Sequence, residues 1–157
     1  MAKKVADQLV DTLEKAGVRR IYAVTGDSLN EVNEAVRKNG RLRWIHVRHE
    51  ETGAYAAAAE AQLTGELACC AGSSGPGHVH LINGLYDAQR SGARVLAIAS
   101  TIPSREFGTE YFQETNTIKL FDDCSYYNQV ATTPEQFPRM LASGDLITWG
   151  RGDRTSR

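Results

Sequence analysis

The apolar residues of this chain change their spacing repeatedly, from a helical period to a strand-like period and back. Val5, Leu9 and Leu13 share one face of a helix, whereas residues 21–24 form a short run typical of a strand. Further strand-like runs occupy residues 44–47, 67–71 and 94–100. Alternating elements of this kind build a parallel sheet that helices cover. We therefore predict an α/β fold with a doubly wound parallel sheet flanked by helices.

The segments between these strands carry helix signals. We expect helices at 5–16, from an N-cap within 25–28 to Asn39, at 50–63 and at 76–90. Residues 101–115 have no periodic pattern, and a loop of that length in a small domain is usually functional or mobile. After this loop we predict a short helix at 118–122, a last strand at 126–130 and a helix from 134 to 141.

Composition excludes several classes of function. The 157 residues carry 18 basic and 19 acidic side chains, so no excess positive charge favours nucleic acid. No apolar run approaches the ~20 residues that span a bilayer, and no signal peptide opens the chain, so we predict a cytoplasmic protein without a membrane segment. The three cysteines do not suggest disulfides, and the adjacent Cys69 and Cys70 are expected to be buried on opposite faces of a strand.

The glycine-rich segment 72–77 joins a predicted strand to a predicted helix. Amide groups at such a turn favour anions. However, the segment matches neither the dinucleotide-binding nor the P-loop pattern, since no lysine follows its last glycine. Taken alone, it is more simply an ordinary tight turn.

Glu50 and Glu51 follow the second predicted strand and open a helix. The partial positive charge of the helix start stabilises carboxylates there, which is the simpler interpretation. Alternatively, a carboxylate at the carboxyl end of a parallel strand lies where open α/β sheets bind ligands. The sequence does not say which of the two points inward.

The four histidines form two closely spaced pairs, His46 with His49 and His78 with His80. Neither pair has the i, i+4 spacing that places two zinc ligands on one helix face. We therefore predict no metal site in this chain.

Five segments, in order and in spacing, resemble the N-terminal, pyrimidine-binding domain of thiamine-diphosphate enzymes of the pyruvate oxidase and acetolactate synthase group. They are residues 24–30, 48–51, 75–77, 80–88 and 111–114. The resemblance covers about residues 3–142. We expect this domain at 1–142, incomplete at its C-terminal end, and a divergent tail at 143–157 that resembles a truncation or frameshift. His80 and the segment Asn83–Asp87 are more similar to the pyruvate oxidases.

The resemblance implies roles for particular residues. Glu50 matches the catalytic glutamate that hydrogen-bonds the ring nitrogen of the cofactor's aminopyrimidine and helps to remove the C2 proton of the thiazolium. Four residues match positions around the pyrimidine or one helical turn beyond it: Gly26, Ser73, Pro76 and His80. Phe112 and Gln113 match a loop pair that faces the reacting carbon.

The resemblance also implies a parent protein that decarboxylates pyruvate and passes electrons to FAD, then to quinone or oxygen. Mg²⁺ and FAD would be held by domains that this sequence does not contain. The diphosphate-binding domain of another chain would complete the site in a homo-oligomer. We expect the isolated chain to be inactive, and to form dimers or aggregates through apolar surface that a full domain would cover.

Three other interpretations stay open. The chain could belong to a carboligase of the acetolactate synthase type. It could be a separate subunit that completes its site with a partner polypeptide. It could also be a non-catalytic assembly or nucleotide-binding module.

Overall fold

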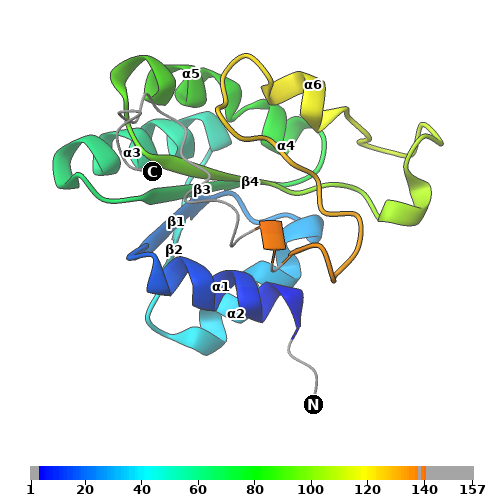
Figure 1. Cartoon of the computed structure of the whole chain (residues 1–157), viewed down its shortest axis with the longest axis horizontal. Coiled ribbons are helices and arrows are strands. Elements are labelled where there is room, and N and C mark those ends of the chain that lie inside the picture. The colour runs from blue at the N-terminus through cyan, green and yellow to red at the C-terminus, as the bar shows by residue number, and fades with distance from the viewer. Residues whose placement is uncertain (1–3, 138, 141–157) are drawn as a thin grey trace.

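A computed structural model of the protein describes residues 4–137 and 139–140. Its centre is one parallel sheet in the order β2-β1-β3-β4 (Figure 1). The strands are β1 (Arg20–Ala23), β2 (Arg43–His46), β3 (Ala68–Gly72) and β4 (Val95–Ala99). All three pairings are parallel. The predicted α/β fold with a parallel sheet is confirmed.

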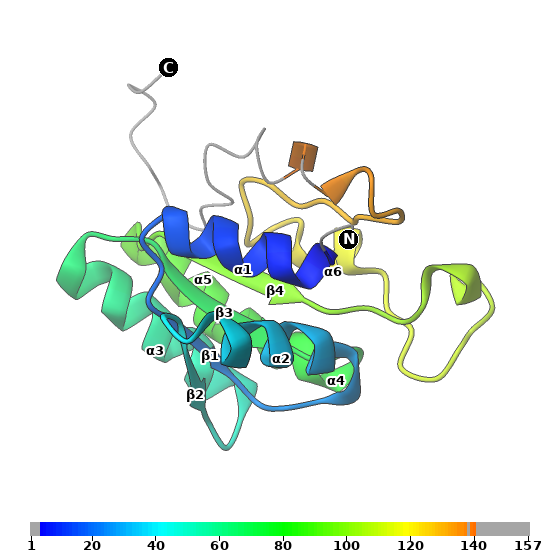
Figure 2. The same ribbon diagram turned by 90° about the horizontal axis from the view of Figure 1, so that it is seen from below.

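Helices cover both faces of the sheet (Figures 1 and 2). One face carries α1 (Val5–Lys15) and α2 (Asn30–Asn39), and the other carries α3 (Glu50–Thr64) and α5 (Ile82–Ser91). The short α4 (Pro76–Val79) follows β3, and α6 (Thr117–Phe121) follows the long loop after β4. Each face has its own apolar core, because α1 and α2 pack over one side of the strands and α3 and α5 over the other.

Strand β3 has all five residues buried, as expected of a strand covered on both faces. Cys69 belongs to the core beneath α1 and α2, and Cys70 to the core beneath α3 and α5, so the predicted opposite orientation is confirmed. Burial raises the pKa of Cys70 to about 12 and that of Cys69 well above its ordinary value. Both thiols therefore stay protonated and serve as small apolar groups.

Two helix predictions differ from the structure in detail. The helix predicted at 76–90 is divided into α4 and α5, because the amide of Leu81 bonds to His78 three residues back rather than four. The predicted N-cap within 25–28 makes no capping bond from a side chain. A 3-10 turn, Asp27–Leu29, opens α2 instead, and the Ser28 hydroxyl accepts a bond from the amide of Ser74.

The strand predicted at 126–130 is wrong, since this segment forms no ladder with any described strand. Tyr127 and Val130 line a hollow of about 290 Å³ beside β4, whereas Tyr126 is 57% exposed. The Asn128 amide instead donates to the carbonyl oxygens of Thr117 and Ile118 in α6. Its polar contacts are therefore with a helix, which periodicity cannot indicate.

Two further predictions fall partly or wholly outside the described residues. Of the helix predicted at 134–141, residues 137, 139 and 140 are helical, while 138 and 141 are not described. The predicted tail at 143–157 and its boundary at residue 142 lie outside them entirely.

Candidate functional site

The candidate site lies at the carboxyl end of the sheet, where three strand-to-helix turns meet. The strand order places β2 to one side of β1 and β3 to the other, so the crossover connections leave β1 and β3 toward opposite edges of the sheet. Open α/β sheets bind ligands at such a switch point. Gly26 follows β1, Glu50 follows β2 and Ser73 follows β3, and all three are residues that the sequence singled out.

The turns after β1 and β3 are in direct contact. A Cβ built on Gly26 would lie 2.4 Å from Oγ of Ser73, so no larger residue fits. The hydroxyls of Ser28 and Ser73 are 2.9 Å apart, and the amide of Ser74 donates to Oγ of Ser28 over 3.0 Å. These bonds fix the two turns relative to each other.

The Gly75-Pro76-Gly77 turn brings bare backbone up to Glu50. Pro76 occupies the first position of α4, as expected. A Cβ on Gly77 would lie 3.1 Å from Cβ of Ser73 and 3.2 Å from Oε1 of Glu50. Because glycine has no side chain, the turn packs closely against this carboxylate oxygen.

Glu50 is the inward member of the acidic pair. It is the first residue of α3 and only 8% exposed, whereas the Glu51 side chain is 36% exposed and accepts a bond from Asn83. Nδ1 of His80 lies 3.0 Å from Oε2 of Glu50. Oε2 is engaged by His80, and Oε1 is the oxygen that lies against Gly77. The question that the sequence left open is settled in favour of Glu50.

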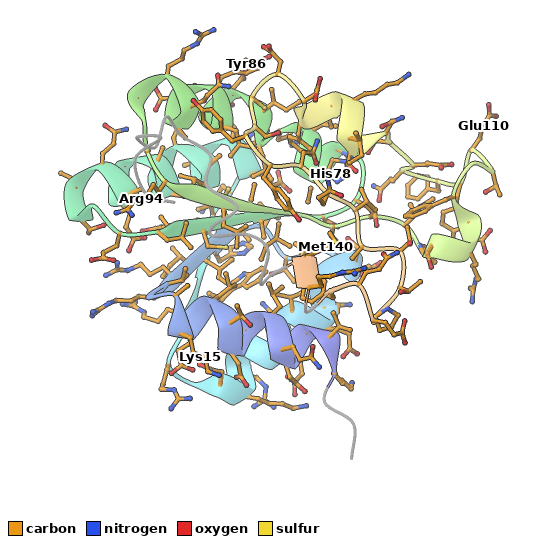
Figure 3. The ribbon with its side chains drawn as sticks, viewed as in Figure 1. Lys15, His78, Tyr86, Arg94, Glu110 and Met140 are labelled. Carbon is orange, nitrogen blue, oxygen red and sulfur yellow. The ribbon has the colours of Figure 1, made fainter. Side chains whose placement is uncertain are left out.

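The two histidine pairs are separated by the fold. His80 turns toward Glu50 and stacks on His49, with ring centroids 4.3 Å apart. His78 turns into the interior, where it is 1% exposed and lies edge-on to Phe121 (Figure 3). His46 is exposed at the end of β2. Each close pair in the sequence therefore contributes one ring to the neighbourhood of Glu50.

His78 anchors the long loop to the sheet. Its Nδ1 lies 2.8 Å from the carbonyl oxygen of Ser100, and its Nε2 lies 2.5 Å from the hydroxyl of Thr115. A carbonyl only accepts, so Nδ1 carries the proton and Nε2 of the neutral ring accepts from Thr115. Burial lowers the pKa of His78 below its ordinary value of 6.5, which favours this neutral form.

This arrangement gives stability a defined dependence on pH. The unfolded chain takes up a proton at residue 78 as the pH falls through 6.5, whereas the folded chain resists until a lower pH. The free energy of unfolding should therefore decrease as the pH falls below about 6.5, and this part of the decrease should end below the folded pKa. Urea unfolding between pH 8 and pH 5 should show a steeper decrease for the wild type than for His78→Gln. The exposed His46→Gln serves as the control and should follow the wild type; equal slopes for wild type and His78→Gln would refute the role of His78.

The loop at 101–116 reaches the site through Gln113. The Ser74 hydroxyl donates to Oε1 of Gln113 over 3.2 Å, and a Cβ on Gly75 would lie 2.7 Å from Cβ of Gln113. Gln113 has a positive φ of 65°, a strained conformation for a residue with a side chain. Phe112 is 78% exposed and lines an open depression of about 890 Å³ along this loop. Glu110 lies at the outer tip of the loop (Figure 3).

The structure thus brings six of the seven predicted site residues together around one turn: Gly26, Glu50, Ser73, Pro76, His80 and Gln113. Phe112 is next to them in the chain, but its ring points into the open depression. The sequence reasoning did not assign Ser28, Gly77 or His49 to the site. For Ser28 the available signal was a hydroxyl in the turn after the first strand; for His49 there was none beyond its position next to Glu50.

The sequence of this chain is similar to those of several known proteins. Residues 3–120 match the family described as thiamine pyrophosphate enzyme, N-terminal TPP binding domain. A 42.6 kDa protein encoded in the isoamylase 3' region of Pseudomonas amyloderamosa is 59% identical over 140 residues, which are 89% of this chain and 35% of that protein.

Several relatives carry names that describe an activity, and they are of two kinds. The pyruvate oxidase of Lactiplantibacillus plantarum is 39% identical over 134 residues, which are 85% of this chain and 22% of that protein. The chloroplastic acetolactate synthase of Arabidopsis thaliana is 33% identical over 150 residues, 95% of this chain and 22% of the synthase. The chain therefore spans about a third or less of the length of these relatives. Among the described helices, none is both long and apolar enough to cross a membrane.

Proposed function

Because the chain belongs to the thiamine pyrophosphate enzyme family as its N-terminal TPP binding domain, we propose that the Glu50 site holds the aminopyrimidine ring of thiamine diphosphate. The observation that carries this proposal is the buried Glu50 carboxylate at the switch point of the sheet, held by His80 and packed closely against the glycine turn. A flat ring needs a wall without side chains, and an aminopyrimidine needs a hydrogen-bonding partner at its edge. Gly26 and Gly77 supply backbone without side chains, and Glu50 supplies the hydrogen-bonding partner.

Each residue around Glu50 has a different role in binding the ring. Oε2 is engaged by His80, which fixes the plane of the carboxylate and leaves Oε1 for the ring nitrogen. Gly26 and Ser73 form the neighbouring wall, and Gln113 closes the side of the Gly75 turn. Glu50 is 8% exposed, so little water competes for Oε1.

Glu50 then acts as a positioned acid and base. A proton held between Oε1 and the ring nitrogen can shift toward either partner, which changes the basicity of the exocyclic amino group on the same ring. When bound, thiamine diphosphate supplies the carbon nucleophile that cleaves a bond next to a carbonyl group. The chain's own contribution is to hold the ring, exclude water and move this proton.

The wider reaction that we propose is oxidation of pyruvate, as in the relative named pyruvate oxidase. The motif His80-Leu81-Ile82-Asn83-Gly84-Leu85-Tyr86-Asp87 supports this choice over a carboligase. The similarity to acetolactate synthase keeps the carboligase as the second candidate. We propose that the diphosphate, Mg²⁺ and FAD bind to residues outside this chain, and that the diphosphate-binding domain of another copy completes the site in a homo-oligomer. The isolated chain would then bind the ring without catalysing turnover.

Binding of the ring alone tests the proposal. We expect 4-amino-5-hydroxymethyl-2-methylpyrimidine to bind the purified chain, and Glu50→Ala to weaken this binding by about tenfold or more, since a hydrogen bond to a charged group is worth ~1.5–3 kcal/mol. Isothermal titration or ligand-detected NMR would measure the affinities.

The matched control is Glu51→Ala, which removes the neighbouring carboxylate in the same helix turn and should leave the affinity within twofold. Circular dichroism and unfolding curves establish that both variants are folded. Equal weakening by both substitutions, or none by Glu50→Ala, would refute the assignment of Glu50.

A further inference from the structure

We propose that His49, Glu50 and His80 form a binding site for a zinc-like divalent transition metal. One ligand atom from each residue lies within 4.8 Å of the other two. The three come from two separate turns, since His49 and Glu50 open α3 and His80 ends α4. The proposal departs from the sequence prediction of no metal site, because the relevant histidines belong to different pairs in the sequence.

The donor set favours one class of metal. Two imidazoles and one carboxylate suit zinc, cobalt and nickel, whereas magnesium and calcium prefer oxygen ligands alone. Three protein ligands also leave a fourth tetrahedral position open to water. The His49 and His80 side chains are 47% and 41% exposed, so an ion reaches the cluster from solvent.

The geometry requires only a small rearrangement. Ligand atoms around a tetrahedral zinc are about 3.3 Å apart, given bonds of about 2.0–2.1 Å. Nδ1 of His80 and Oε2 of Glu50 are already 3.0 Å apart. The remaining adjustment falls on His49, whose exposed ring stacks on His80 and turns by rotation about its side-chain bonds. Glu50 itself stays fixed at the start of α3.

A second consequence rests on the proposed function. If Glu50 is shared, zinc and the aminopyrimidine ring compete for the same carboxylate. The metal would then occupy the domain only in the absence of cofactor, and would act as an inhibitor of cofactor binding. The two sites overlap at one residue, so the competition is direct.

Cobalt and zinc titrations of the chain, without an affinity tag, test the site. We expect Co²⁺ to produce the visible absorption of a tetrahedral nitrogen–oxygen site, and Zn²⁺ to displace it. His49→Gln, Glu50→Gln and His80→Gln should each weaken Zn²⁺ binding at least about tenfold, because even changes outside the ligand shell cost 10–100-fold. His46→Gln is the control, because of the two histidines outside the cluster His46 is the exposed one, whereas His78 is buried.

The outcomes separate the two proposals. Zinc binding that survives His49→Gln and His80→Gln, or that falls equally in His46→Gln, would overturn the metal site, whatever the aminopyrimidine does. Zinc binding that depends on the three residues supports the site. In that case, an aminopyrimidine affinity at least tenfold weaker in saturating zinc supports the sharing of Glu50, and an unchanged affinity would overturn it.

Discussion

Turnover of a 2-oxo acid by a polypeptide that joins this domain to a diphosphate-binding domain is expected to fall at least about 100-fold when Glu50 is replaced by glutamine. Glutamine has nearly the same shape and can still accept a bond from His80. It cannot take up or release a proton at Oε1, the oxygen that lies against Gly77. The substitution therefore removes proton transfer while preserving the shape of the site.

The measurement is kcat at saturating cofactor, so that weaker binding does not contribute to the loss. Glu51→Gln is the matched control, because it changes the neighbouring carboxylate, whose bond is to Asn83 on the surface. We expect its kcat to stay within about twofold of the wild type. A kcat for Glu50→Gln within threefold of the wild type would contradict the catalytic role of Glu50.

Stability is expected to fall by roughly 2–3 kcal/mol in Gly84→Ala, because the added methyl group has no space. A Cβ at this position would lie 2.5 Å from Cβ of Ala54 and 2.7 Å from the amide nitrogen of Tyr55. Gly84 therefore marks the place where α5 packs directly against the backbone of α3. No rotamer change relieves a clash with backbone, so the two helices must move apart.

Within a helix, alanine is normally more favourable than glycine by about 1 kcal/mol, so helix propensity alone predicts a more stable Gly84→Ala chain. The clash predicts a less stable one. The change in the free energy of unfolding, measured by urea unfolding, distinguishes the two. Asp87→Ala provides the control on the same helix, since Asp87 is exposed and its replacement should change the free energy of unfolding by less than about 0.5 kcal/mol. A Gly84→Ala chain as stable as the wild type would refute the close packing of α3 and α5.

The sheet and its helices were predictable because their signals are local. Periodicity placed all four strands, and glycines at 40, 65 and 92 end α2, α3 and α5 in the left-handed conformation. The strand at 126–130 failed because a strand requires a partner, and the local pattern does not reveal whether one lies alongside. The division of α4 from α5 escaped prediction because it depends on a shift in bonding at one residue, Leu81.

The site was predictable only in part, and mostly through resemblance. From spacing alone, Glu50 and Glu51 were equivalent, and only the packing of α3 separates the buried one from the exposed one. The histidines show the same limit, since His78 and His80 are two residues apart and point in different directions. The contacts that assemble the site join turns that are far apart in the sequence, such as Ser28 with Ser73 and Ser74 with Gln113.

Amide chemical-shift mapping of the ¹⁵N-labelled chain during titration with the aminopyrimidine locates the ring most directly. The expected result is that the largest shifts fall on the amides of Gly26, Ser73 and Gly77, and that Glu50→Ala abolishes them. Shifts centred instead on Leu96 and Ala97, which line the hollow beside β4, with the Gly77 amide unchanged, would contradict the assignment of the Glu50 site as the place where the ring binds.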